Sequence, residues 1–154
     1  MKLRTIVIAL AVCFLGAGVC LAQDSWMGTW KLNESKSKFS PGSGKNSTVV
    51  YEAAGDNVKV TVDGVDGSGK PAHNEWTGKF DGKEYQVTGD ANQDMRSYKK
   101  IDDHTLSLTG KKGGKTTLTA RITLAADGKT RTVTSTGTDS SGKKMTNTAV
   151  YDKQ

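Results

Sequence analysis

Hydrophobic and polar residues alternate along most of this chain beyond residue 22. Valines occupy every second position in residues 57–64, and Leu, Ala or Ile occupies every second position in residues 116–125. A period of two, with many β-branched residues, is typical of strands that bury one face. The pattern therefore predicts a chain built almost entirely from half-buried β-strands.

Ten segments carry this pattern or contain a clear part of it. They cover residues 25–33, 47–53, 57–64, 73–80, 83–89, 96–101, 105–111, 116–125, 130–138 and 144–152. Most of the connections are short and contain Asp-Gly or Gly-Gly pairs, which supply the positive φ angles of tight hairpins. Such short connections join antiparallel neighbours, because a parallel crossover needs a dozen or more residues.

A meander of this kind either stays open, with two exposed edge strands, or curls until its first and last strands pair. Closure removes the edges. We therefore predict an all-β fold: a single up-and-down antiparallel β-barrel of about eight to ten strands. One domain, residues 23–154, contains the whole barrel.

The N-terminal segment, residues 1–22, has the pattern of a secretory signal peptide. Lys2 and Arg4 form a basic region, an apolar run follows, and Cys-Leu-Ala precedes Gln23. We expect this signal-peptide helix to be cleaved after Ala22, so that the mature protein is secreted or periplasmic in a bacterium. Without Lys2 and Arg4, 20 basic and 16 acidic residues remain, a mild net charge of +4.

Both cysteines lie in this N-terminal segment. Cleavage leaves a mature chain with no thiol, disulfide or cysteine-based zinc site. The alternative is a lipoprotein acylated on Cys13 or Cys20, but valine precedes each cysteine where lipidation prefers a small residue. Secretion without a lipid anchor, and no stable membrane insertion after cleavage, is the favoured interpretation.

The first predicted strand places two indoles on one face. Trp26, Gly28 and Trp30 share this face, and Gly28 leaves room for another group to pass close to the backbone. We expect these residues to form a structural plug at one end of the barrel, with the Trp30 indole N–H bonded there.

The two ends of the mature chain resemble known barrels. "GTWKL" at residues 28–32 resembles the start of the fatty-acid-binding proteins and the Gly-x-Trp signature of the lipocalins, both in the calycin group. "TNTAVYDKQ" at residues 146–154 is similar to the Thr-x-Arg-x-Tyr ending of the fatty-acid binders. The chain also resembles uncharacterised small secreted bacterial proteins with a GTWKLN opening and a VYDK ending. These resemblances imply a lipocalin-like β-barrel.

The chain departs from the fatty-acid binders where they hold a carboxylate, with arginines and a tyrosine. Tyr151 matches the tyrosine, but Ala149 and Ala120 stand near the positions of the arginines, and Arg121 falls on the opposite face. Residues 34–46 replace the two-helix lid. We therefore expect a ligand that is uncharged at the end nearest Tyr151, and weak binding of long-chain fatty acids.

Other chemistry has little support in the sequence. His73 and His104 stand alone in polar, turn-like settings, which is typical of surface histidines rather than metal ligands. Asp63 and Asp66 lack the spacing of a calcium loop, and no nucleophile elbow or phosphate loop is present. We expect no enzyme activity, no metal, no cofactor and no nucleic-acid partner.

Aromatic residues provide the best candidate site. If the barrel curls as expected, a small hydrophobic or amphipathic ligand would contact the following side chains: Trp76, Phe80, Tyr85, Tyr98 and Tyr151. The alternatives are that these rings only fill the interior, or that a filled barrel serves as a cell-envelope interaction module, an inhibitor or adaptor. A cavity of several hundred Å³ would favour a ligand. In each case we expect a monomer.

Overall fold

The computed structural model describes residues 25–138 and 141–154, and in this part of the chain ten strands follow one another. The predicted signal peptide, residues 1–22, lies outside the described residues. A single 3₁₀ turn, η1 (Glu34–Lys36), is the helical element among them. The strands are β1 (Gly28–Leu32), β2 (Lys45–Ala54), β3 (Asn57–Val65), β4 (Pro71–Gly78), β5 (Tyr85–Thr88), β6 (Met95–Asp102), β7 (Thr105–Lys112), β8 (Lys115–Leu124), β9 (Thr130–Thr138) and β10 (Lys144–Lys153).

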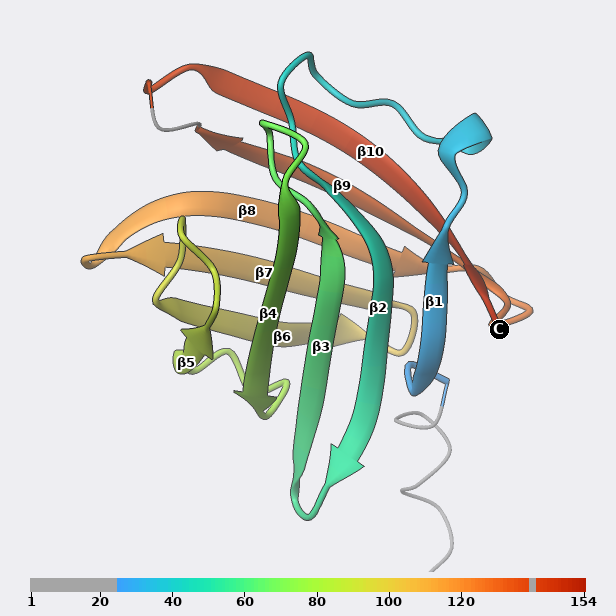
Figure 1. Ribbon diagram of the computed structural model, residues 1–154. Helices are drawn as coiled ribbons and strands as arrows, with labels where there is room; N and C mark the ends of the chain where they lie inside the picture. The colour runs from blue at the N-terminus through green and yellow to red at the C-terminus, as the bar shows by residue number, and fades with distance from the viewer. Residues whose placement is uncertain (1–24, 139–140) are drawn as a thin grey trace, which may run out of the picture.

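Every strand pairs antiparallel with its neighbours in the sequence, and β1 closes the ring by pairing with β10 (Figure 1). Trp30 of β1 lies opposite Val49 of β2 on one side and Lys153 of β10 on the other. The predicted all-β, up-and-down closed barrel is confirmed. The alternation of side chains and the short hairpins are sufficient to produce it, because closure pairs both edge strands.

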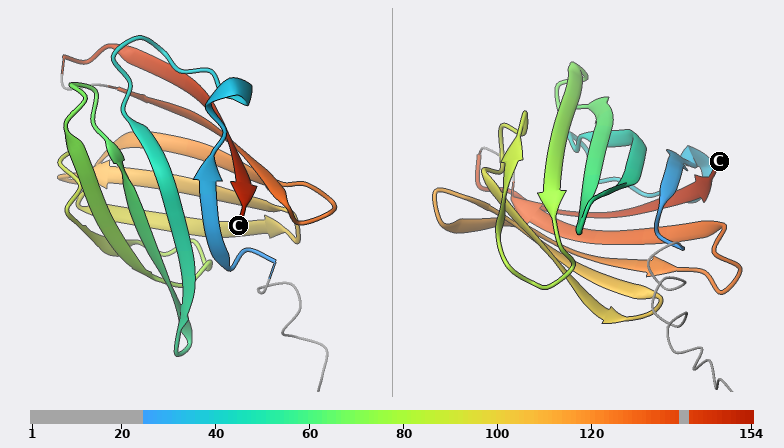
Figure 2. Two further views of the ribbon diagram at one scale, coloured as in Figure 1. Left: turned by 45° about the vertical axis from the view of Figure 1, so that its right-hand side comes forward. Right: turned by 90° about the horizontal axis from the view of Figure 1, so that it is seen from below.

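The barrel is strongly twisted. In Figures 1 and 2, β2–β4 cross over β7–β9 at a steep angle, so two groups of strands face each other across the interior. The right-handed twist of each strand accumulates around the sheet and produces this crossing. The hairpin between β7 and β8 fits this twist, because Gly113 and Gly114 have φ angles of 55° and 77°. Positive φ at both central residues matches the two-residue loops that follow strand twist.

The connection from η1 to β2 is extended and continues the wall beyond the short β1. Lys38 exchanges backbone hydrogen bonds with Thr148 of β10, and the Ser40 amide donates to the Asn147 side chain. Between β1 and β2 the chain has one 3₁₀ turn, η1, and no other helix.

The two ends of the barrel differ in composition. The end formed by the last residues of β2, β4, β6, β8 and β10 is called the aromatic end, and the opposite end is called the open end. Near the aromatic end the core contains Trp26, Trp30, Tyr51, Val58, Trp76, Leu106 and Leu124, each at most 4% exposed.

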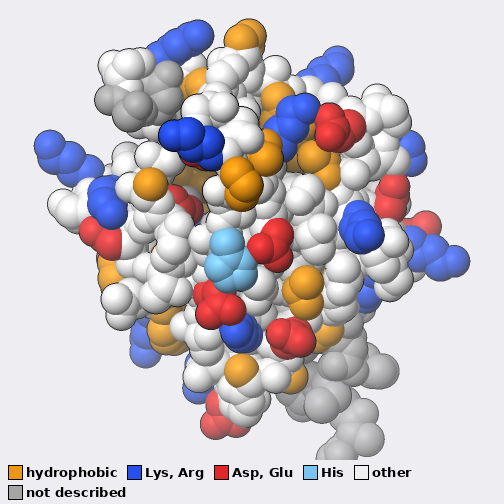
Figure 3. All heavy atoms as spheres, viewed as in Figure 1, with side chains coloured by type: hydrophobic (Ala, Val, Ile, Leu, Met, Phe, Trp, Pro, Cys, Tyr) orange, Lys and Arg blue, Asp and Glu red, His pale blue; other side chains and the backbone are white. Residues whose placement is uncertain are grey.

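The surface has no dominant patch on the face drawn in Figure 3, where acidic and basic side chains are interspersed and hydrophobic ones are scattered. In the described residues no helix is long and apolar enough to cross a membrane.

Candidate ligand-binding cavity

A cavity of about 280 Å³ lies inside the barrel. Its wall includes side chains from β2, β3, β4, β6, β7, β8, β9 and β10. Exposed residues, Asn92 and Thr138, belong to the wall at the open end, so the cavity reaches solvent there.

Small residues on one side of the barrel make room for this cavity. Ala120 of β8, Ser135 and Gly137 of β9, and Ala149 of β10 all line it. Larger apolar side chains also line the cavity, among them Val62, Leu108 and Ile122. Asn74 adds a polar group, a buried side-chain oxygen without a partner in the described chain. The interior is therefore of mixed polarity.

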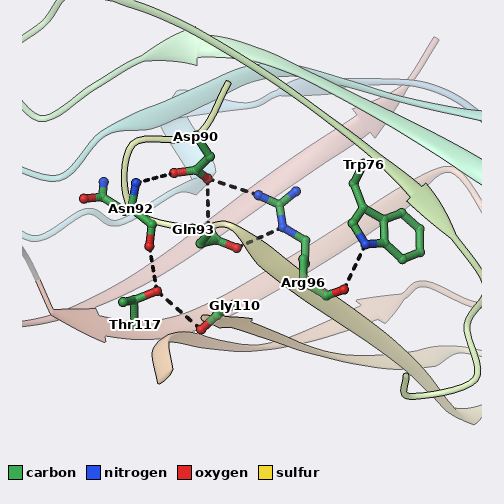
Figure 4. Close-up of polar contacts among 7 residues, drawn as sticks. All are labelled: Trp76, Asp90, Asn92, Gln93, Arg96, Gly110 and Thr117. Carbon is green, nitrogen blue, oxygen red and sulfur yellow. Dashed lines mark hydrogen bonds and ion pairs between the residues drawn. The ribbon is translucent and has the colours of Figure 1, made fainter. Parts of the chain in front are cut away.

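A hydrogen-bond network holds the β5–β6 connection against the wall near the open end (Figure 4). The guanidinium of Arg96 donates from Nη2 to Asp90 at 3.1 Å and from Nε to Gln93 at 2.9 Å. Gln93 in turn donates to the same Asp90 oxygen at 2.9 Å. Arg96 is only 5% exposed, and its charge is matched by a carboxylate. This side chain holds the β5–β6 connection in place and also lines the cavity.

Neighbouring strands complete the network. The Trp76 indole donates to the Arg96 carbonyl at 2.9 Å, and the Thr117 hydroxyl donates to the Asn92 carbonyl, also at 2.9 Å. Gly110 has no side chain where Gln93 packs against its backbone, and a Cβ there would overlap Gln93. The connection is thus held against β7 and β8, and β6 is held to β4.

A second arginine, Arg131, lies deeper in the cavity wall, toward the aromatic end. It is the second residue of β9, is 2% exposed and pairs across the sheet with Tyr151 and Leu124. Its Cζ lies 4.9 Å from the ring centre of Trp30, 4.8 Å from that of Tyr51 and 4.9 Å from that of Tyr151. Aromatic faces attract cations, so these three rings partly offset the loss of hydration.

Two nitrogens of Arg131 lack the hydrogen-bond partners that the guanidinium of Arg96 has. Nε and Nη1 are buried and have no hydrogen-bond partner in the described part of the chain, and no carboxylate there pairs with the guanidinium. The expectation that the interior offers only neutral groups near Tyr151 is therefore wrong. Ala120 and Ala149 do line the cavity, but a neighbouring strand supplies a cation.

Burial controls the ionisation of two tyrosines in the wall. Burial raises the pKa of Tyr151 to about 12, while the charge of Arg131 opposes this rise. Burial also raises the pKa of Tyr98, assisted by the neighbouring Tyr51. Both phenols are neutral at neutral pH, and the Tyr151 hydroxyl donates to the Asn46 carbonyl at 3.0 Å.

The five aromatic residues predicted to contact a ligand separate into two groups. Tyr98 and Tyr151 line the cavity, whereas Trp76, Phe80 and Tyr85 lie outside its wall. The latter three form a packed cluster toward the aromatic end, in which the Trp76 ring lies 4.7 Å from Tyr98 and 5.8 Å from Tyr85.

This aromatic cluster covers the weakest seam of the barrel. The four-residue strand β5 has two residue pairs with β4 and two with β6. Gly78, at the end of β4, allows the rings to meet, because a Cβ there would lie 2.5 Å from Tyr85 and 2.7 Å from Trp76. Ring packing thus compensates for missing ladder hydrogen bonds, since aromatic pairs contribute beyond their buried area.

Two of the three residues predicted to form a plug, Trp26 and Trp30, are buried, and Trp30 lies beside Arg131. Trp26 and Trp30 are 1% and 0% exposed, and the Trp30 indole donates to the Trp26 carbonyl at 3.0 Å. Gly28 has a φ of 108°, which favours glycine, and a Cβ there would lie 3.2 Å from the Lys153 side chain. Lys153 uses this space to reach the Ser25 carbonyl at 3.1 Å.

Both histidines lie on the surface. His73 is exposed and contacts Asp63 at 2.6 Å, and His104 lies in the exposed turn after β6. Asp66 accepts backbone hydrogen bonds from Ser68 and Lys70, which is the arrangement of a turn. Among the described residues, no three His, Cys, Asp or Glu side chains are grouped to hold a metal.

The alternation that predicts β9 also contains the signal for Arg131. With a period of two, Arg131 falls on the same face as Val133, and Arg96 falls on the same face as Tyr98. Both arginines are therefore placed inward by the pattern of their own strands. The resemblance to the fatty-acid binders gives no signal for either arginine, because neither stands near the positions of Ala120 and Ala149.

No family model matches this chain, and no curated protein matches it. Two solved barrels are similar in backbone path. A redesigned β-barrel, mFAP1, bound to DFHBI has 17% sequence identity and a TM-score of 0.45, covering 86% of this chain and 98% of that chain. EF1p2_mFAP2b bound to DFHBI has 12% identity and a TM-score of 0.49, covering 86% and 97%. The resemblance to calycins and to the proteins with a GTWKLN opening stays a prediction.

Proposed function

We propose that this protein binds a small organic molecule, which enters the barrel at its open end. The observation that carries the proposal is the cavity of about 280 Å³, with both apolar and polar side chains in its wall. Natural ligand pockets combine a mostly apolar lining with a few polar groups that fix orientation. Small side chains on β8–β10 leave the space, and the network around Arg96 holds the entrance in shape.

The volume limits the size of the part that enters. At roughly 30 Å³ for each water-sized group, the cavity holds about nine or ten such groups. A ligand with about ten non-hydrogen atoms inside the barrel fits, and a longer one would extend past Asn92 and Thr138 into solvent.

Two further parts of the proposal rest on the sequence. The N-terminal signal pattern supports action outside the cytoplasm, in a secreted or periplasmic location. The absence of a recognisable catalytic motif supports binding without catalysis. The alternative of an interaction module requires a filled interior, so the cavity favours the ligand-binding function.

Filling the cavity tests the proposal directly. Ala120→Phe places a ring into the cavity from β8, and Thr119→Phe adds the same ring to the exposed side of the same strand. Both variants and the wild type are purified from the native host and examined by native mass spectrometry for a bound small molecule. Circular dichroism checks that each variant is folded.

We expect a bound mass on the wild type and on Thr119→Phe that is lost from folded Ala120→Phe. Titration of the wild type with environment-sensitive fluorophores of about ten to fifteen non-hydrogen atoms provides a second measurement. A wild type that carries no molecule and binds no fluorophore would contradict the proposed function, and so would binding that Ala120→Phe leaves unchanged.

A further inference from the structure

We propose that Arg131 is the anion-binding residue of this cavity, and that the ligand carries a carboxylate which reaches it. The proposal rests on the ligand-binding function proposed above and assigns the chemical class of the ligand. It replaces the uncharged ligand predicted from the sequence, which depended on an interior without a free cation.

The first step of the argument is the unsatisfied hydrogen-bonding capacity of Arg131. A guanidinium has five N–H donors, and three of them, one on Nε and two on Nη1, have no partner in the described chain. Buried donors are almost always paired in folded proteins, and a buried charge is normally matched by another. A residue that breaks both rules in the wall of a cavity is a candidate ligand contact.

Arg96 provides an internal comparison. It lines the same cavity and is buried to a similar degree, but its Nε and Nη2 donate to Gln93 and Asp90. This barrel therefore pairs a buried arginine with a carboxylate when the arginine has a structural role. The environment of Arg131 consists of aromatic rings, which attract its charge without accepting its in-plane hydrogen bonds.

The charge balance of the wall favours a monoanion. The ionisable residues in it are Asp90, Arg96 and Arg131, besides the neutral tyrosines, and Asp90 and Arg96 pair with each other. One unmatched positive charge remains. A carboxylate matches this charge and the planar donor geometry of a guanidinium. A phosphate dianion would bring a second charge for which the described wall has no partner.

The position of Arg131 also orients the ligand. Arg131 lies toward the aromatic end, whereas Phe39, Leu118 and Met145 line the cavity nearer the open end. A carboxylate at Arg131 places the apolar body of the ligand among these side chains. The ligand is therefore an amphipathic acid that enters with its charged group first.

The experiment compares acids with neutral molecules of the same shape. Octanoate and 2-naphthoate are titrated at neutral pH by isothermal calorimetry, each beside its neutral partner, octan-1-ol or 2-naphthol. The proteins are the wild type, Arg131→Gln, Arg131→Met and the control Arg121→Gln. Arg121 lies on the exposed face of the adjacent strand β8, so it has the same charge outside the cavity.

For at least one skeleton we expect the wild type to bind the acid at least tenfold more tightly than the neutral partner. Both Arg131 variants should lose this preference while still binding the neutral molecule, and Arg121→Gln should retain it. The skeleton that shows the preference distinguishes an aliphatic acid from an aromatic one. If the Arg131 variants do not fold, the wild type still tests the proposal. A wild type that binds each acid no more tightly than its neutral partner contradicts it.

The two proposals fail in different ways. Equal or tighter binding of the neutral partners by the wild type overturns the role of Arg131 while the ligand-binding function stands. An acid preference that survives in folded Arg131→Gln and Arg131→Met also overturns it. If no acid, no neutral partner and no fluorophore binds, the ligand-binding function itself is contradicted.

Discussion

Trp30 contacts several parts of the barrel at the aromatic end, so its truncation should be severe. It is fully buried on β1, between β2 and β10, and its indole N–H donates to the Trp26 carbonyl at 3.0 Å. Its ring also faces two cations, Arg131 at 4.9 Å and Lys153 at 5.3 Å. Trp30→Ala removes packing, a buried hydrogen bond and both of these contacts.

Packing dominates the magnitude. Truncating a buried Phe or Trp to Ala costs about 3–5 kcal/mol, and leaving a buried acceptor unpaired adds about 1–3 kcal/mol. These terms are not additive, because water or neighbouring side chains enter the space. We expect a loss of about 4–5 kcal/mol in the free energy of unfolding, against a total of about 5–15 kcal/mol for a protein domain.

Urea melts followed by circular dichroism measure this loss. With a slope of about 2 kcal/mol per M, the midpoint of Trp30→Ala should fall by about 2 M. Trp30→Phe keeps a ring but loses the hydrogen bond, so its midpoint should fall by less. Lys31→Ala, at the exposed neighbouring position on β1, is the control and should change little. A loss below about 1 kcal/mol for Trp30→Ala, typical of surface substitutions, would refute the reasoning.

Four other substitutions test separate parts of the structure by denaturant unfolding. Gly78→Ala should cost about 1–3 kcal/mol, because its methyl group overlaps the aromatic cluster; no loss would show that the rings can move apart. Asp90→Asn should cost about 3 kcal/mol, because Arg96 stays buried without its counter-charge; an unchanged midpoint would contradict this pairing. Arg131→Met should change stability by less than about 2 kcal/mol, because removing an unpaired buried charge offsets the lost ring contacts; a larger loss would indicate a paired arginine. Burial raises the pKa of Tyr151 to about 12, so the neutral phenol stabilises the fold fully below pH 10, and this stabilisation is lost as the pH rises through 12. Tyr151→Phe should therefore lack about 3 kcal/mol of the alkaline destabilisation seen in the wild type. Equal pH profiles of the free energy of unfolding would contradict this.

The fold was predictable because its determinants are local. Alternation defines each strand within ten residues or fewer, and the glycines of the short connections allow the backbone to reverse, as at Gly113 and Gly114. With antiparallel neighbours fixed by loop length, closure is the remaining choice. The Gly28 and Trp30 positions were also readable, because both follow from the period of a single strand.

The candidate site was less predictable because it depends on several strands together. An aromatic residue lines the cavity only if it lies at the right depth along the barrel axis. This depth depends on twist and on register across non-neighbouring strands. Tyr98 and Trp76 lie in contact, yet only Tyr98 borders the cavity. Sequence alternation gives the face of a residue and leaves its depth undetermined.

Arg131 illustrates a different difficulty. Its strand pattern turns it inward, but an unpaired charge in a core contradicts the usual distribution of residues, so its residue type favours a position at a strand end in solvent. Its burial depends on three rings from β1, β2 and β10, which closure alone brings together. The unpaired, buried charge of Arg131 is therefore the feature that points to a ligand.

The small residues that leave the cavity open connect stability with function in this barrel. Ala120, Ser135 and Ala149 face the interior where larger apolar side chains would pack against Leu108 and Ile122. A barrel selected for stability alone would gain by filling this space, since buried methylene groups contribute about 0.8 kcal/mol each. If the space serves a ligand, Ala120→Phe should abolish binding while stability is kept or raised, as in other trade-offs between stability and function. A folded variant that is both less stable and fully active would place the cavity outside the binding site, because its ring would then be accommodated elsewhere in the barrel.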